Sequence, residues 1–141
     1  MKLINMIVVT PKAVINRSKS VKYRLHTSGE RTLTDKDGYM FSFSAKDTKG
    51  SGRLHKQLVW FDVPKVTPKL VPNAKVYCSC EFFNFYLAYA LNKRDACVPM
   101  KDINYAMNTK APITNHFNKN YLCKHLYKVM EHFKKLKKNR L

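Results

Sequence analysis

The sequence predicts an α+β domain in which an antiparallel sheet forms the N-terminal half and two helices follow. Segments before residue 76 alternate apolar and polar residues with the two-residue period of strands. The period then changes, and the C-terminal segment repeats apolar residues at helical spacing. Two short cysteine motifs lie where the sheet should end and where the last helix should begin, so we expect a metal site to join the two.

The length and composition predict one domain over residues 1–141. Apolar residues make up 45% of the 141-residue chain, which is enough to bury a single core. Within it we expect a β-rich part (1–75), a metal-binding part (76–133) and a basic tail (134–141). No apolar run approaches the roughly 20 residues that span a bilayer, and no clean cleavage site follows the N-terminal apolar patch. We therefore expect the protein to be neither secreted nor membrane-spanning.

The strands are predicted from alternation and are separated by segments rich in turn residues. The expected strands are residues 3–9, 21–26, 39–45 and 54–64, followed by a short strand that ends in "KVYCSC". The polar segment 27–38 should be a hairpin connection or a mobile loop, and segment 45–53 a further loop. Pro68 and Pro72 exclude a regular helix from segment 65–75, which we interpret as an extended connector.

Two helices are predicted after Cys80. Residues 82–91 are apolar on nearly every side, which favours a buried helix whose aromatic side chains pack in the core. Near the C-terminus, apolar residues recur at helical spacing while lysines occupy the outer faces. The apolar positions are Leu122, Leu126, Val129, Met130, Phe133 and Leu136. This pattern predicts an amphipathic helix whose exposed side is basic.

The two cysteine motifs together supply a complete set of metal ligands. Cys78 and Cys80 end a predicted strand, where residues i and i+2 point to the same face. Cys123 and His125 have the same spacing just before a helix. Inside a regular helix, residues two apart point about 200° away from each other, but at a helix start the first can still converge with the second. The pattern C-x-C, forty-two residues, C-x-H gives three thiolates and one imidazole, as in structural zinc sites.

Other interpretations of the cysteines stay open. A Cys78–Cys80 disulfide would close a small, strained loop, and a chain without a signal peptide favours a reducing compartment. Buried free thiols are common, whereas a cysteine nucleophile would need an orienting partner that the sequence does not offer. Cys97 or His116 could replace one ligand, but neither has a neighbour at metal-binding spacing. We expect His26, His55 and His132 to be structural or surface residues, and Trp60 to lie in the core.

The motifs "YCSC" and "LCKHLYKVM" resemble the SWIM-type zinc finger over residues 76–133. The resemblance implies zinc bound by Cys78, Cys80, Cys123 and His125, and a module that binds DNA or proteins. The strands ahead are similar in order to the β-hairpins that lead into that finger, although the spacer between the motifs is long. The aromatic segment and "CKHL" also resemble uncharacterised, virion-associated proteins of tailed bacteriophages. That resemblance implies a location in the virion or the host cytoplasm.

The charge balance predicts a polyanionic partner. Lys and Arg number 27 against 9 Asp and Glu, a formal net charge of +18 that repels itself unless negative charge lies nearby. We expect binding to nucleic acid, most simply DNA, through phosphates and largely without sequence specificity. The expected phosphate contacts are Arg17, Lys19, Lys22, Arg24, Lys124, Lys128, Lys134, Lys135, Lys137, Lys138 and Arg140.

Three other function classes were weighed against nucleic-acid binding. A structural assembly protein of a capsid, neck or baseplate could use the same charge to bind acidic protein neighbours. A membrane surface is less favoured, because no predicted helix combines a broad exposed apolar face with this charge. An enzyme would need paired carboxylates or an open metal position, and the acids are scattered, so we expect neither catalysis nor a small-molecule substrate.

Overall fold

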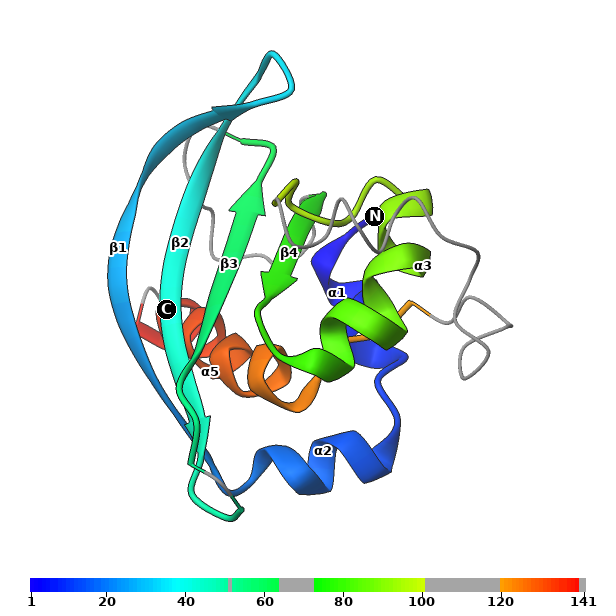
Figure 1. The fold of residues 1–141 in the computed structure, drawn as a ribbon. Coiled ribbons are helices and arrows are strands. Elements are labelled where there is room, and N and C mark those ends of the chain that lie inside the picture. The colour runs from blue at the N-terminus through cyan, green and yellow to red at the C-terminus, as the bar shows by residue number, and fades with distance from the viewer. Residues whose placement is uncertain (51, 64–72, 101–119, 140–141) are drawn as a thin grey trace.

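The fold is an antiparallel sheet with helices before and after it in the chain (Figure 1). The computed structural model describes residues 1–50, 52–63, 73–100 and 120–139. The elements are α1 (Leu3–Val8), α2 (Lys12–Ser18), β1 (Val21–Leu33), β2 (Lys36–Asp47), β3 (His55–Phe61), β4 (Ala74–Cys78), the π-helical turn η1 (Phe83–Leu87), α3 (Ala88–Lys93) and α5 (Lys124–Asn139). The strands pair in the order β1-β2-β3-β4, which confirms the predicted α+β class. Most of the expected connector 65–75 lies outside the described residues.

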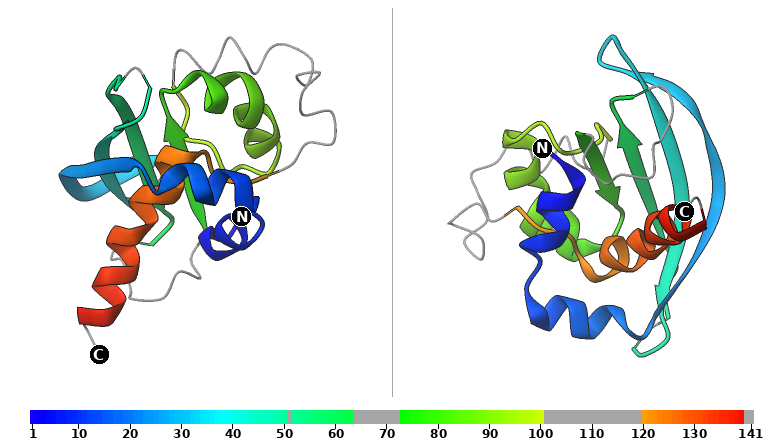
Figure 2. Two further views of the ribbon diagram at one scale, coloured as in Figure 1. Left: turned by 90° about the horizontal axis from the view of Figure 1, so that it is seen from below. Right: turned by 180° about the vertical axis from the view of Figure 1, so that it is seen from behind.

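Helix α5 crosses one face of the sheet and contacts all four strands (Figures 1 and 2). Its buried side chains are Leu126, Val129, Met130 and Phe133, which confirms the predicted amphipathic pattern over this part of the helix. The Phe133 ring meets Phe41, Phe43 and Phe61 edge-on, with ring centroids 4.9, 5.9 and 5.3 Å away. Neither α5 nor any other described helix is long and apolar enough to cross a membrane.

The N-terminal segment is helical, so the strand predicted over residues 3–9 was wrong. Leu3, Met6 and Ile7 are buried at spacings of three and four, while Val8 and Val9 are exposed. A short apolar run fits either period, and here burial against the rest of the core selects the helix. A second helix, α2, follows Pro11 and was not predicted.

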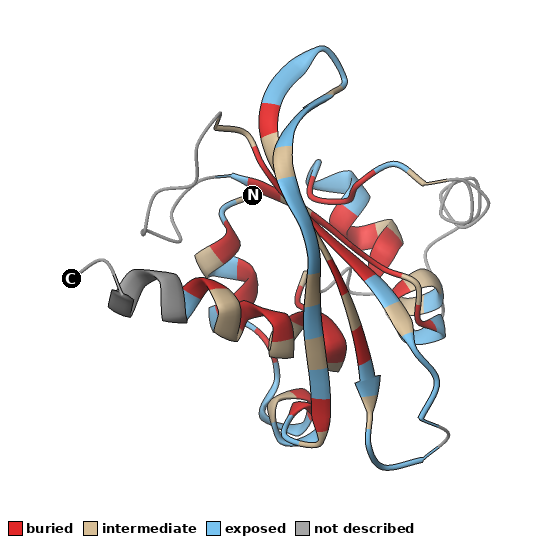
Figure 3. Cartoon of the chain, turned by 90° about the vertical axis from the view of Figure 1, so that its left-hand side faces the viewer, coloured by how far each residue is buried: buried red, intermediate tan, exposed pale blue. Residues whose placement is uncertain are grey.

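The hairpin between β1 and β2 is longer than expected. Segment 27–38, predicted as a connection or loop, is almost wholly paired, and the turn is reduced to Thr34 and Asp35. Both turn residues have positive φ, 50° and 62°, as a two-residue type I′ turn requires. The paired polar residues could not be recognised by alternation because both faces of this distal part are largely exposed, as Figure 3 shows.

One glycine lets the tryptophan of β3 pack against this hairpin. A Cβ atom at Gly38 would collide with the Trp60 ring and the Phe61 carbonyl oxygen. Without it, Trp60 is only 1% exposed, and its Nε1 donates to the Arg31 carbonyl at 2.8 Å. The core position predicted for Trp60 is confirmed.

The aromatic helix after Cys80 buries one side only. Phe83, Leu87 and Leu91 are fully buried, whereas Phe82 is 39% and Phe85 61% exposed. The helix lies beside the β4 edge of the sheet rather than in its middle, so only one side meets the core (Figure 1). The prediction of a helix is correct, but the prediction that its aromatic residues all pack in the core is wrong for these two.

Candidate metal centre

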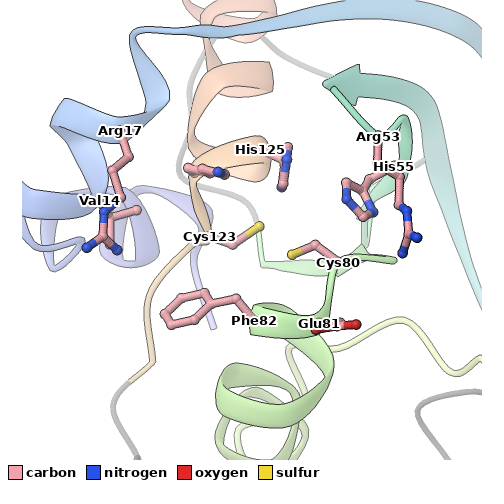
Figure 4. A pocket seen from close by; sticks show the side chains of 10 residues that line it. Val14, Arg17, Arg53, His55, Cys80, Glu81, Phe82, Cys123 and His125 are labelled. Carbon is pink, nitrogen blue, oxygen red and sulfur yellow. The ribbon is translucent and has the colours of Figure 1, made fainter. Parts of the chain in front are cut away.

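The end of β4 and the start of α5 bring two cysteine motifs together. The ligand atoms of Cys78, Cys80, Cys123 and His125 all lie within 4.8 Å of one another, and all four residues are buried. Figure 4 shows Cys80 and Cys123 reaching toward each other from the segment after β4 and the segment before α5, with His125 above them. Sulfur atoms 2.3 Å from a tetrahedral zinc ion are about 3.8 Å apart, so the group is close to the size of such a site.

Two helix starts face the group. Cys80 precedes the aromatic helix, and its sulfur accepts a hydrogen bond from the Phe83 amide at 3.4 Å. Cys123 precedes α5, and its sulfur accepts one from the Leu126 amide at 3.5 Å. Each sulfur therefore caps a helix N-terminus, where free amides and the helix dipole favour negative charge. The sequence predicted this role for the start of α5 but not for the aromatic helix.

The thiols share charge unequally. Hydrogen bonds from Cys123 and Cys78 lower the pKa of Cys80 far below its ordinary value. Burial raises the pKa of Cys78 and of Cys123. The protein alone thus favours one thiolate, held by two thiols, and a bound cation is what would let all three ionise.

Neighbouring polar groups also fit a metal ion. Nδ1 of His125 is buried without a hydrogen-bond partner, and ligation of a metal there would supply one. Gln57, fully buried on β3, donates from Nε2 to the Cys78 sulfur at 3.5 Å, which is a contact that orients a ligand. A buried Cys₃His group of this kind indicates a zinc-binding site.

The alternative ligands do not join the group. All four cysteines are free. Cys97 lies at the edge of β4, bridged to Val76, and its thiol donates to the Val98 carbonyl at 3.6 Å. His116 lies outside the described residues.

His55, expected to be a structural or surface residue, borders the metal group. Its ring centroid lies 4.8 Å from that of His125, and its Nδ1 is 3.4 Å from the Ser79 hydroxyl. Burial, followed by the nearby charge of His125, lowers the pKa of His55. His132 packs against Phe41 and Phe43 instead. Only the pairing of β3 with β4 places His55 here, so the sequence gave no direct signal.

The predicted phosphate-binding residues divide into two groups. Arg17, Lys19, Lys22 and Arg24 are exposed on α2, just after it, and on β1. On α5, Lys124 is paired with Asp47 at 2.7 Å, Lys128 with Glu131 at 3.1 Å, and Lys134 lies 5.5 Å from the centroid of the Tyr127 ring. Lys135, Lys137 and Lys138 belong to α5 but their side chains lie outside the described part, as does Arg140. The described α5 lysines near the metal group are thus already engaged.

The sheet adds cations that the sequence prediction omitted. Pairing of β1 with β2 places Lys46 directly opposite Lys22, and Arg24 opposite Ser44. Pairing of β2 with β3 places Lys56 on the other side of Ser44. All four cations are exposed, and we name them the sheet-face patch. The alternation of β2 could have put Lys46 on the open face, but the register that aligns it with Lys22 depends on the unrecognised hairpin turn.

Comparisons with protein-family models, with curated proteins and with solved structures find no match to this chain. The likeness to the SWIM finger therefore consists of the two motifs and the buried Cys₃His group that they form.

Proposed function

We propose that the protein is a non-enzymatic, zinc-stabilised basic protein that binds nucleic acid through its phosphates, largely without sequence specificity. Zinc is proposed because three thiolates and one imidazole would complete its tetrahedral shell. Four protein ligands leave no open position for a reacting water, which supports a structural role over a catalytic one. The metal would fasten the start of α5 to the end of β4, in the manner of the SWIM finger that the motifs resemble.

The single observation that supports nucleic-acid binding most directly is the sheet-face patch. Phe41 and Phe43 face α5, so the alternate residues of β2, including Lys46, point to the opposite face of the sheet. Lys22, directly across from Lys46, and Arg24 and Lys56, on either side of Ser44, lie on this same face. In Figure 3, β1 is exposed or half-buried along most of its length.

The patch is electrostatically unfavourable in the isolated protein. Like charges directly opposite each other on neighbouring strands destabilise a sheet by up to about 1 kcal/mol. The described residues contain four ion pairs between lysines and acids, and none includes a member of the patch. A phosphate backbone would relieve this repulsion and release counterions on binding.

The test is the salt dependence of binding to mixed-sequence duplex DNA. Replacing the four patch residues by Gln should lower the slope of log affinity against log salt by about 0.9 per lost phosphate contact. A matched control removes the same charge from exposed cations elsewhere: Lys2, Lys12, Lys93 and Arg94. The control should change the slope by less than about one contact. Loss of repulsion should leave the melting temperature of the patch variant unchanged or slightly raised.

Absence of DNA binding even at low salt would overturn this proposal. In that case the second class, an assembly protein whose basic surface binds acidic neighbours, would take its place. Equal slopes for the patch and control variants would reject the sheet face as the binding surface. The location in a bacteriophage virion rests on the sequence resemblance alone.

A further inference from the structure

A pocket of about 360 Å³ opens beside the metal group. Four segments form it: α2, the residues leading into β3, residues 80–82 and the start of α5 (Figure 4). Pockets of this size accept small ligands or single groups of larger ones. Because Cys80, Cys123 and His125 lie in its wall, a zinc clamp would also fix the shape of this pocket.

The walls of the pocket carry positive charge. Arg17 and Arg53 are exposed and lie on opposite sides, with Lys124 between the same elements. Glu81 is the one acid among the lining residues. Within the described residues, no ion pair joins Arg17 or Arg53 to an acid. Two guanidinium groups with free donors suit phosphate oxygens, which they can bind bidentately.

An aromatic ring stands at the side of the pocket where Arg17 lies (Figure 4). Phe82 lines the pocket, is 39% exposed and stacks on Tyr86 at a centroid distance of 4.8 Å and an interplanar angle of 15°. Tyr121, itself buried, contacts both rings at 6.4 and 6.1 Å. Phe82 is therefore held in place by its neighbours while part of its surface stays available to a ligand.

We propose that this pocket takes one nucleotide of a single-stranded nucleic acid, with a phosphate at Arg17 or Arg53 and the base against Phe82. The proposal rests on the nucleic-acid binding proposed above and specifies its substrate class. Aromatic side chains beside cationic groups are how proteins bind single strands, because every base has a flat face. In a duplex that face is covered by the neighbouring base pairs, so a duplex could use only the cations. The cationic walls favour this occupant over an apolar peptide.

The experiment compares an oligothymidine of about 16 nucleotides with a duplex of the same length, at matched salt, using the full chain loaded with zinc. The single strand should bind at least about tenfold more tightly. Phe82→Ala should lower affinity for the single strand by about 5- to 150-fold, the range that one base stack contributes, and leave duplex binding nearly unchanged. Phe82→Tyr should restore most of the loss.

Phe85→Ala is the matched control. Phe85 belongs to the same helix and is more exposed, but it does not line the pocket. This variant should bind the single strand within about twofold of the parent protein. Arg17→Gln and Arg53→Gln should each lower the salt slope for the single strand by about 0.7. Zinc content and melting temperature of each variant establish that the fold is intact.

The outcomes separate this inference from the function on which it rests. Equal binding of both DNA forms, with no effect of Phe82→Ala, overturns the inference and leaves the proposed function standing. Equal losses in the Phe82 and Phe85 variants overturn the assignment to the pocket. Failure of both DNA forms to bind at low salt overturns the inference together with the proposed function.

Discussion

The two ends of the described part of α5 are held to the sheet by different means. Near residue 133 the helix is anchored by packing, where Phe133 meets three phenylalanines of β2 and β3 edge-on. At its start there are instead three sulfurs and an imidazole facing Gln57, with polar pocket walls close by. Buried polar groups need partners, and here a metal ion is the partner that we propose. The comparison indicates that the metal does the work of a core at the end where the core is polar.

The largest expected effect comes from breaking the metal end. Zinc binding is worth about 10 to 16 kcal/mol in zinc-finger peptides, which is as large as the whole stability of a typical domain, about 5 to 15 kcal/mol. Cys123→Ser should therefore abolish tight zinc binding and leave the chain unfolded or barely folded at 25 °C, as measured by circular dichroism and thermal unfolding. Cys97→Ser is the control, since Cys97 is equally buried but lies outside the group. A Cys123→Ser protein as stable as the control would break the comparison.

Breaking the packed end should cost less and spare the metal. Phe133→Ala removes a fully packed ring and should lower the free energy of unfolding by about 3 to 5 kcal/mol. Because Phe133 is distant in the chain from the four ligands, the folded variant should keep its zinc. Denaturant unfolding and metal analysis of the same sample measure both quantities. Loss of zinc from folded Phe133→Ala protein would show that the two ends are not independent.

A smaller effect is expected beside the metal end, where Asp47 holds Lys124. Hydrogen bonds from Lys124, and then from Ser20, keep the pKa of Asp47 well below its ordinary value of 3.8. A carboxyl group with a lowered pKa stabilises the fold above its unfolded pKa, and this contribution is lost as the pH falls through the folded value. Asp47→Asn should therefore cost about 1 kcal/mol at neutral pH, because both partners are partly exposed.

The pH profile of the Asp47→Asn variant sharpens that prediction. The stability difference from the parent protein should stay flat between about pH 5 and pH 8 and shrink below about pH 4. Urea unfolding across this range measures the difference directly. A difference that disappears between pH 8 and pH 5 would mean that another group, and not Asp47, titrates. The variant also frees Lys124, so its affinity for DNA should rise slightly rather than fall.

Much of the fold could be predicted because its signals are local. The helical spacing from Leu126 to Phe133 and the paired spacing of Cys78 with Cys80 and of Cys123 with His125 depend on one element at a time. The N-terminal helix could not be predicted, since six apolar-rich residues fit a strand or a helix until they are packed. The exposure of Phe82 was hidden for a similar reason: a segment apolar on every side does not indicate which side faces the core.

The pocket could not be predicted because its residues meet only in the folded chain. Arg17, Arg53 and Phe82 come from separate elements, and no spacing in the sequence relates them. The same holds for Lys22 and Lys46, which depend on the register of a hairpin with an unrecognised turn. Local patterns therefore predicted the metal ligands, whereas the surfaces proposed to bind nucleic acid required the structure.

The most direct test of the metal clamp is the number of zinc ions bound to each intact chain, measured by native mass spectrometry. One zinc ion per chain is predicted for the parent protein and for Cys97→Ser, and none at stoichiometric zinc for Cys78→Ser or His125→Ala. A parent protein without zinc, or ligand variants that keep a full equivalent, would contradict the account.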